Sequence, residues 1–295
     1  MSTLAAALNS GNFVVTTELN PPKGTNLTAL FEKADLLKGR VTACNLTDSH
    51  TARMTMSPVA VAHLLLDRGV EPILQVTGRD RNRLALQADL LGAAALGITN
   101  IVCMSGDDPQ SGDHPQAKPV FDLDAITLLR ALSSLQAGYD LGGNQLNGTP
   151  GFYAGAVVNP GAADLTKELQ RMEDKVQAGA QFFQTQAVYD PRTFETFMNA
   201  AQKYHIPVLA GVLLLKSGTM AQYLNDNVPG ISVPAALIQE LEEVQDRTAK
   251  SVEIGSRIIK QLKPMCHGVH LMTLGWEARI PQLLQAAEIS SYRQI

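Results

Sequence analysis

Short apolar runs alternate along the whole chain with longer stretches in which apolar residues recur at helical spacing. Eight runs have the length and β-branched character of buried strands: Phe13–Glu18, Ala43–Thr47, Pro72–Thr77, Asn100–Ser105, Tyr153–Val158, Phe182–Ala187, Pro207–Leu213 and Gly268–Thr273. Helical stretches between them include Asn26–Leu37, Ser57–Arg68, Asp80–Leu96, Asp122–Ser134, Thr166–Ala178, Pro191–Tyr204 and Pro234–Gln261. The alternation is typical of βα units with a parallel sheet.

Eight βα units with no leftover segment of domain size favour a closed barrel over an open sheet. We therefore predict an α/β protein whose residues 1–295 form a single (β/α)8 TIM barrel domain. A doubly wound sheet is the alternative, but its glycine-rich fingerprint is missing from the first βα turn, Glu18–Gly24. Two connections are long: Gly106–Phe121 is a candidate active-site loop, and Leu135–Phe152 is a candidate surface excursion.

Composition narrows the class of protein. The formal net charge of −4 provides no basic surface for nucleic acid, and 45% hydrophobic residues can bury a large core. We find neither a secretory signal nor an apolar stretch long enough for a membrane span, so we expect a cytoplasmic protein without membrane contact. The three cysteines are far apart and odd in number, which predicts reduced thiols.

Polar residues cluster where the predicted strands end, which is where the active site of a (β/α)8 barrel lies. They are Glu18, Asn45, Thr47, Gln75, Thr77, Ser105, Asp107, Asp108, Asn159, Gln184, Gln186 and Lys216. Such residues can simply be hydrated at the rim of the barrel or form hydrogen bonds with loop amides. Alternatively they bind a ligand or take part in catalysis, which would explain why polar groups are buried despite the free-energy cost of desolvation. Glu18 is the strongest functional candidate because two prolines rigidify the chain directly after its strand.

An ordered set of short motifs resembles the methylenetetrahydrofolate reductase family. The motifs are TTELNPPKG at the first strand, NLTD at the second, LQVTGRDRN at the third, MSGDDP at the fourth and AGAQFFQTQAVYD around the sixth. The resemblance runs from about Gly11 to Ile280 and is specific as a set. It implies an FAD-binding (β/α)8 barrel that reduces 5,10-methylenetetrahydrofolate to 5-methyltetrahydrofolate, in one-carbon metabolism and methionine biosynthesis.

The resemblance also implies roles for individual residues. Glu18 matches the family's general acid, Asp107 the aspartate beside the flavin and the folate, and Gln186 the glutamine that binds the pterin. The implied flavin contacts are Thr47, Asp48, Gln75, Ser105, Gly106, Asp107, Phe121, Asp122, Asn159 and Lys175. Gln75 and Asn159 stand where histidines are usual, and Ser105 where an arginine is usual.

After the last two predicted strands the sequence differs from the family pattern at positions that concern the choice of electron donor. Gly218 aligns near an aromatic residue that stacks on folate or nicotinamide, and Gly275 and Trp276 replace an asparagine-arginine pair. We therefore expect NADH to be a poor reductant for the isolated chain. Two electron donors stay open as alternatives, NAD(P)H and a redox partner protein. Trp276 or Phe152 supplying the missing ring is the competing possibility. We also expect a homo-oligomer.

The implied reaction needs an acid and an anion. Protonation of N10 opens the five-membered ring of the substrate and leaves an N5 iminium cation that accepts hydride from flavin. Glu18 could be the acid if an apolar pocket raises its pKa, while Asp107 would stay ionised and stabilise the cation. Gln186 can donate to and accept from the pterin edge, and its alternative is a core amide.

Other constellations compete with these assignments. Lys175 is either a phosphate ligand or a solvated helix lysine, and Cys266-His267-x-x-His270 is unsuited to a metal because strand residues three apart face opposite ways. Lys216 at a strand end supports an alternative, a Schiff-base lyase on the same barrel. A third hypothesis is a non-catalytic flavin- or folate-binding subunit of a larger complex.

Overall fold

The computed structural model describes residues 2–289, in which eight parallel strands close into one barrel with strand order β1-β2-β3-β4-β5-β6-β7-β8. The strands are β1 Val14–Leu19, β2 Ala43–Leu46, β3 Pro72–Thr77, β4 Asn100–Met104, β5 Tyr153–Val158, β6 Phe182–Ala187, β7 Val208–Leu213 and β8 Gly268–Met272. β1 pairs with β8 to close the barrel, with Thr16 opposite His270. The (β/α)8 prediction is confirmed, and the strand limits differ from it by at most one residue at either end.

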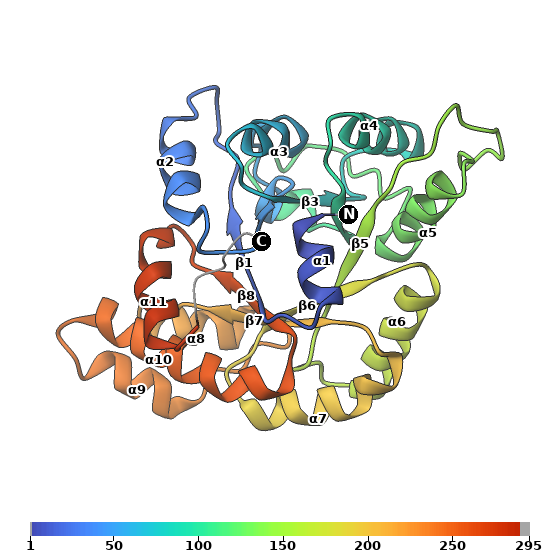
Figure 1. Ribbon diagram of the computed structural model, residues 1–295. Coiled ribbons are helices and arrows are strands. Elements are labelled where there is room, and N and C mark those ends of the chain that lie inside the picture. Colours follow the sequence, from blue (N-terminus) through green and yellow to red (C-terminus); the bar gives the residue numbers. More distant parts are fainter. Residues whose placement is uncertain (1, 290–295) are drawn as a thin grey trace.

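Helices surround the barrel (Figure 1). They are α1 Thr3–Asn9, α2 Thr28–Leu37, α3 Pro58–Asp67, α4 Arg83–Ala95, α5 Ala125–Gln136, α6 Leu165–Gln177, α7 Pro191–Ala201, α8 Gly218–Asn227, α9 Ala235–Glu242, α10 Arg247–Leu262 and α11 Ile280–Ala286. Five short 3-10 turns join them: η1 His50–Ala52, η2 Pro109–Ser111, η3 Gln202–Tyr204, η4 Lys263–Met265 and η5 Glu277–Arg279.

The predicted helix Pro234–Gln261 is divided in two, which corrects the sequence-based expectation. Asp246 begins α10 by accepting a hydrogen bond from the backbone N–H of Ala249, so a new helix N-terminus interrupts the apolar periodicity. α8 also lay outside the predicted set, although Ser217 caps it in the same way through Met220 N–H. Both caps are short polar residues that periodicity alone does not detect.

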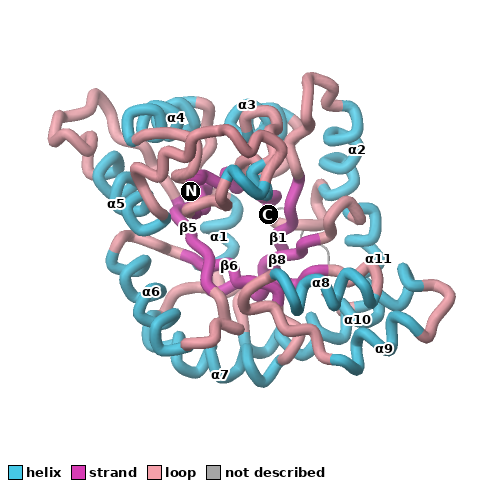
Figure 2. The backbone as a smooth tube through the Cα atoms, turned by 180° about the vertical axis from the view of Figure 1, so that it is seen from behind, coloured by secondary structure: helices cyan, strands magenta, loops and turns pink. Residues whose placement is uncertain are grey.

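The first helix plugs one end of the barrel. Leu4, Ala5, Ala7 and Leu8 of α1 are buried against a layer of inward-facing side chains that includes Val14 and Phe182. Hydrogen bonds tether the helix, because Ser2 Oγ donates to Asn100 Oδ1 at 2.5 Å and Thr3 N–H donates to Glu71 Oε1 at 3.2 Å. Figure 1 looks onto this plugged end, and Figure 2 looks onto the opposite end, where the loops following the strands gather.

Side chains alternate in direction along each strand, so every second residue points into the barrel. The layer next to α1 is apolar and contains the stacked rings of Tyr153 and Phe182, whose centroids are 5.1 Å apart. Gly155 makes room for this stack, because a Cβ there would lie 2.4 Å from the Phe182 ring. Within residues 2–289, α1 and this apolar layer fill the end of the barrel where the strands begin, and the loops that follow the strands surround the other end.

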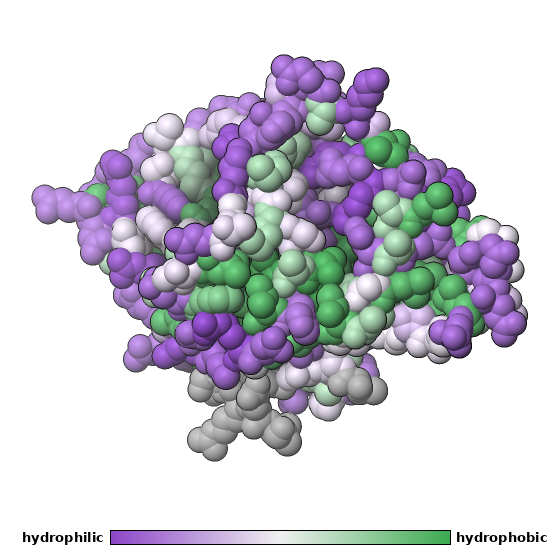
Figure 3. All heavy atoms as spheres, turned by 90° about the horizontal axis from the view of Figure 1, so that it is seen from above, coloured by the Kyte–Doolittle hydropathy of each residue, from purple (hydrophilic) through white to green (hydrophobic). Residues whose placement is uncertain are grey.

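The face of the molecule that lies at the top of Figure 1 carries an apolar area among polar surroundings (Figure 3). Leu84 of α4 and Leu96, which follows α4, are exposed. The expected homo-oligomer and the single domain over residues 1–295 stay predictions, and residues 1 and 290–295 lie outside the described residues. Between residues 2 and 289, no helix combines the length and apolar character needed to cross a membrane.

Candidate functional site at the barrel mouth

A polar layer lies inside the barrel, one step above the apolar layer. Thr16, Asn45, Gln184 and His270 are all buried and face one another across the barrel axis. Asn45 Nδ2 donates to Gln184 Oε1 at 2.7 Å, and Gln184 Nε2 donates back to Asn45 Oδ1 at 3.0 Å. Thr16 Oγ1 lies 2.9 Å from Nδ1 of His270. The carboxamide pair and the imidazole therefore form one hydrogen-bonded unit across four strands.

Glu18 stands directly above this layer, on the inward face of β1. Its Oε1 lies 3.6 Å from His270 Nε2, and its side chain is 17% exposed. Burial raises the pKa of Glu18, but the hydrogen bond and charge of His270, with contributions from His50 and Gln75, outweigh burial and leave the pKa below its usual value. The expectation of a raised pKa is therefore wrong in this structure, because it considered the apolar strand around Glu18 and not the contact with His270.

Other candidate side chains share the mouth with Glu18. Thr47 is buried and donates to Asn20 Oδ1 at 2.9 Å, while Gln75 is buried and bonds Glu18. Gln186 is partly exposed, and its Oε1 accepts from Ala187 N–H at 3.0 Å rather than from a neighbouring strand. The core-amide alternative considered for Gln186 thus describes Gln184 instead.

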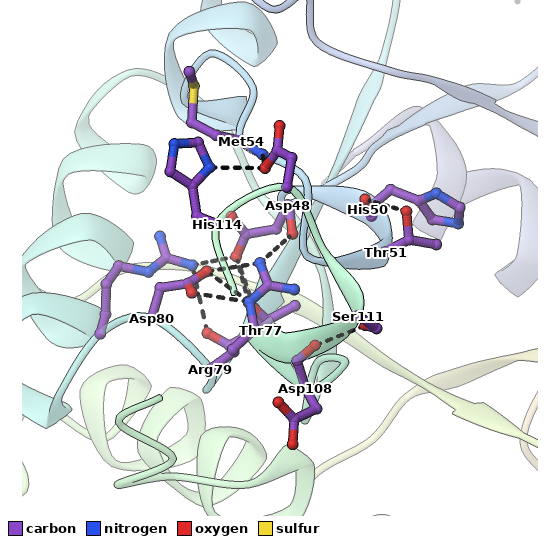
Figure 4. Close-up of polar contacts among 12 residues, drawn as sticks. Asp48, His50, Thr51, Met54, Thr77, Arg79, Asp80, Asp108, Ser111 and His114 are labelled. Atoms are coloured by element: carbon purple, nitrogen blue, oxygen red, sulfur yellow. Dashed lines mark hydrogen bonds and ion pairs between the residues drawn. The ribbon is translucent and has the colours of Figure 1, made fainter. Parts of the chain in front are cut away.

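Asp48 pins the ends of β2 and β3 together (Figure 4). Its Oδ2 accepts from the backbone N–H of Thr77 at 2.9 Å, from the Thr77 hydroxyl at 3.0 Å, and from the guanidinium of Arg81. Arg79, also buried, donates to the Asp48 carbonyl at 3.3 Å and to Asp80. These bonds occupy the Asp48 carboxylate, so its predicted flavin contact would have to compete with them.

The loop after β4 brings Ser105 and Asp107 to the surface of the mouth. Gly106 between them has φ +94°, and a Cβ there would lie 2.9 Å from Cβ of Arg79, so the backbone passes close to the β3 loop. Phe121 is exposed and has φ 43°, a left-handed conformation uncommon outside glycine. Hydrogen bonds from Arg83 lower the pKa of the adjacent Asp122 to about 2 and anchor this segment to α4.

Three loops are fastened together beside the mouth by Asp113, which lies in the loop after β4. Its carboxylate accepts from Met54 N–H at 3.0 Å, pairs with Lys23, and lies 2.8 Å from Nδ1 of its neighbour His114. Figure 4 shows Met54 and His114 at this junction. The fastening supports the interpretation of Gly106–Phe121 as a loop of the site, whereas Leu135–Phe152 packs outside the barrel through Leu141 N–H and Gln87 Oε1.

Two predicted cofactor contacts are occupied by contacts within the chain. Asn159 is in a turn, where its Oδ1 accepts from Gly161 N–H at 3.1 Å and its Nδ2 donates to the Pro229 carbonyl at 3.3 Å. Lys175 is buried on α6, donates to the Val157 carbonyl at 2.7 Å, and has a pKa lowered chiefly by burial. Lys175 is therefore not a solvated helix lysine, and a phosphate there would have to displace its bond to the backbone.

After β7 and β8, where the sequence differs from the family pattern, Lys216 and Trp276 lie next to each other. Gly218 begins α8, and a Cβ there would lie 2.4 Å from Oε1 of Glu242, so this position faces α9. Lys216 donates to the Leu274 carbonyl at 2.5 Å, and its Nζ lies 5.1 Å from the centroid of Trp276. Lys216 thus joins the loops after β7 and β8, an engaged position that lends the Schiff-base alternative no support.

Sequence reasoning assigned no site role to His270 or to Thr16. His270 was considered only as part of a metal pattern, and within residues 2–289 no three His, Cys, Asp or Glu side chains gather as metal ligands. The available signal was position, because His270 is an inward-facing polar residue on β8, in register with Thr16, two residues before Glu18 on the same face of β1.

Two solved structures share the fold. A protein from Clostridium thermocellum, described as uncharacterized and as binding two copies of 5-methyl-5,6,7,8-tetrahydrofolic acid, has a TM-score of 0.67 at 16% identity, with 97% of this chain and 98% of that chain covered. 2,3-Dimethylmalate lyase of the PEP mutase/isocitrate lyase superfamily has a TM-score of 0.53 at 11% identity, with 98% and 86% covered. At these identities the likeness concerns the barrel alone.

Similarity in sequence is more specific. The chain is 25% identical over 235 residues to methylenetetrahydrofolate reductase 2 of Schizosaccharomyces pombe, covering 75% of this chain and 36% of that protein. It is 24% identical over 291 residues to methylenetetrahydrofolate reductase (NADH) 1 of Arabidopsis thaliana, covering 92% of this chain and 48% of that protein. The chain therefore spans less than half the length of these relatives. A family model described as methylenetetrahydrofolate reductase matches residues 3–288, and the chain belongs to the methylenetetrahydrofolate reductase family.

Proposed function

We propose that this chain uses FAD to reduce 5,10-methylenetetrahydrofolate to 5-methyltetrahydrofolate, with Glu18 as the general acid. The observation that carries the proposal is the position of Glu18, a partly exposed carboxylate at the end of the barrel opposite the α1 plug. Membership of the family supplies the reaction class. A carboxyl group that is largely buried yet reachable from the mouth is suited to protonating a substrate nitrogen.

The mouth has the chemical character that a flavin needs. Val157 ends an inward-facing row with 36% of its surface exposed, and Phe121 in the loop that follows β4 is also exposed, so apolar surface is available for the ring system. Thr47, Gln75 and Ser105 would offer hydrogen bonds to the ring edge, and Gly106 lets the backbone approach closely. When bound, reduced flavin would supply the hydride that turns the N5 iminium into a methyl group.

Glu18 would provide the proton that opens the folate ring at N10. In the structure its pKa is held below the usual value, so it must gain a proton as the substrate binds. Covering the mouth with an apolar ring system would remove water from the carboxyl group, and desolvation raises the pKa of a carboxylic acid. Glu18 would then be protonated where the substrate nitrogen needs it.

Asp107 and Gln186 would orient the folate. Asp107 is exposed at the mouth, where an ionised carboxylate stabilises the developing iminium charge. Oε1 of Gln186 accepts from the backbone N–H of Ala187, so its amide nitrogen would be the donor available to the pterin.

A reconstitution experiment tests the proposal. The purified protein is incubated with excess FAD, freed of unbound flavin, reduced with dithionite, and mixed with 5,10-methylenetetrahydrofolate. We expect a bound flavin spectrum, reoxidation that depends on the folate, and 5-methyltetrahydrofolate as the product. No bound flavin, or bound flavin that the folate does not reoxidise, would reject the reductase assignment. The second of these outcomes would favour the non-catalytic binding subunit.

A further inference from the structure

The reciprocal amide pair of Asn45 and Gln184 brings the Gln184 amide into contact with Thr16 and His270. Both side chains are almost completely buried, and one hydrogen of the Gln184 amide is used by Asn45 Oδ1 at 3.0 Å. The second hydrogen faces Thr16 Oγ1 and His270 Nδ1, each 3.3 Å away. The pair with Asn45 fixes the position of the Gln184 amide, and the contacts with Thr16 and His270 place its nitrogen, rather than its oxygen, toward the imidazole.

This arrangement favours one of the two nitrogens of His270 as the site of the proton. The Thr16 hydroxyl accepts from Gln184 and can direct its own hydrogen at Nδ1, 2.9 Å away. A hydrogen on Nδ1 would lie 3.3 Å from the Gln184 amide nitrogen, so two donors would crowd the same buried hydroxyl oxygen, which is costly. The geometry therefore favours Nδ1 as an acceptor and a neutral imidazole with its hydrogen on Nε2, the nitrogen that faces Glu18.

We propose that Gln184, oriented by Asn45, is a positioning residue that fixes His270 as the Nε2–H tautomer and thereby directs the proton of Glu18 out of the barrel toward the substrate. The inference rests on the acid role proposed for Glu18. Its physical content is a restriction on proton direction. His270 Nε2 cannot accept a proton from Glu18 while it already bears one.

The restriction matters only when Glu18 is protonated. As a carboxylate, Glu18 accepts from His270 and from Gln75 and itself favours the Nε2–H tautomer. Once Glu18 is a neutral acid, an unrestricted imidazole could move its hydrogen to Nδ1 and accept the acid proton at Nε2. The proton would then point into the barrel instead of at the substrate. Gln184 excludes that arrangement.

A purely structural role for the amide pair makes a different prediction. Replacing Gln184 by methionine, which has a similar length and no donor, would then lower thermal stability and leave the His270 tautomer unchanged. Gln87 on α4 provides a matched control, because it is also a buried glutamine with two hydrogen bonds, to Leu141 N–H and to the Arg83 carbonyl. Gln87→Met removes a comparable amide far from the mouth.

The decisive readout is the tautomer of His270 in protein labelled with 15N-histidine, recorded by long-range 1H–15N NMR and assigned by loss of the signal in His270→Gln. Glu18→Gln imitates the neutral acid. We expect Nε2–H in the wild type, in Glu18→Gln and in Glu18→Gln with Gln87→Met, and a population of Nδ1–H in Glu18→Gln with Gln184→Met. An Nδ1–H signal in Glu18→Gln alone, which needs no core substitution, would overturn the proposal. So would an unchanged tautomer in the double variant with Gln184→Met.

Kinetics connect the tautomer to the reaction. Gln184→Met should slow reoxidation of the reduced flavin by 5,10-methylenetetrahydrofolate at least about tenfold, a modest part of what a reversed imidazole tautomer costs other enzymes. Flavin reduction by dithionite and the Gln87→Met variant should be unaffected. A changed tautomer with an unchanged rate would reject the positioning role. Failure of the reductase assignment is distinguishable, because wild-type protein would then show no folate-dependent reoxidation whatever the tautomer.

Discussion

Oε1 of Glu18 and Nε2 of His270 lie 3.6 Å apart on paired strands, with the imidazole beneath the carboxylate inside the barrel. The contact links the open mouth to the buried polar layer of Thr16, Asn45 and Gln184. It also reverses the expected direction of the Glu18 pKa, because the interactions with His270, and to a smaller extent with His50 and Gln75, outweigh the burial of the carboxylate. The pKa of Glu18 at the mouth therefore depends on His270, which lies on the interior side of the carboxylate.

The lowered pKa of Glu18 predicts how the folate half-reaction depends on pH. Since the ionised form is favoured, the protonated fraction is small at neutral pH and grows as the pH falls toward the pKa. The rate constant for folate reduction at low substrate should therefore rise as pH is lowered through about pH 8 to 6. Stopped-flow reoxidation of reduced flavin measures it. A rate that is flat over this range would mean a pKa above it.

The lowered pKa of Glu18 also predicts how the stability of the fold depends on pH. A carboxyl group whose pKa is lower in the folded than in the unfolded state stabilises the fold above its unfolded pKa, and that contribution is lost as pH falls through the folded value. Wild-type protein should therefore lose more stability than Glu18→Gln on acidification below about pH 4.5, the ordinary pKa of a glutamate side chain. Urea unfolding at matched pH values provides the comparison.

The α1 plug should contribute substantially to stability. Leu4 is completely buried beneath the barrel, so Leu4→Ala should lower the free energy of unfolding by about 2–5 kcal/mol. Leu84 is 75% exposed, and Leu84→Ala should change it by less than about 0.5 kcal/mol. Urea denaturation followed by circular dichroism distinguishes the two. Equal effects would show that α1 does not stabilise the barrel.

Thr47 tests the flavin site. Thr47→Val removes a hydroxyl that bonds Asn20 at the mouth, and the loss of a hydrogen bond worth about 1 kcal/mol should weaken FAD binding several-fold while the barrel stays folded. Thr17→Val is the control, because its hydroxyl donates to the Leu271 carbonyl at 2.8 Å and belongs to the neighbouring, outward-facing position of β1. Calorimetric titration with FAD should separate the variants; identical affinities would remove Thr47 from the site.

The rebuilt loops at β7 and β8 predict a poor response to NADH. A side chain at position 218 would point at Glu242 rather than into the mouth, and Trp276 is held against Lys216. Loss of one stacking partner costs only about 1 kcal/mol, so a complete loss of NADH reduction would require another donor, such as a partner protein. Stopped-flow measurement of flavin reduction by NADH, NADPH and a low-potential protein donor identifies the electron donor. Rapid, saturable reduction by NADH alone would reject the expectation.

Periodicity predicted the barrel well because each strand is buried on both faces and each helix on one. The limits of β3, β5 and β6 agree with the prediction to the residue. The α1 plug was missed because a seven-residue helix has too few turns for its apolar spacing to stand out. The break between α9 and α10 was missed because the cap at Asp246 acts through one local hydrogen bond.

The site was predictable only as far as strand position determines it. Glu18, Thr47 and Gln75 lie within two residues of the ends of β1, β2 and β3 at inward-facing positions, so alternation brings them to the same end of the barrel. Contacts across the barrel, such as Gln184 with Asn45, depend on which residues lie opposite one another after closure, and no local pattern encodes them. The bonds of Asp48 to Thr77 and of Lys175 to Val157 likewise depend on tertiary structure.

Protonation of the folate by Glu18 can be tested by comparing the two half-reactions of Glu18→Gln with those of the wild type. The variant should bind FAD and be reduced by dithionite as the wild type is. Its reoxidation by 5,10-methylenetetrahydrofolate should be at least about 100-fold slower, the lower range for loss of a positioned general acid. Unchanged reoxidation, or equal slowing of both half-reactions, would contradict the account.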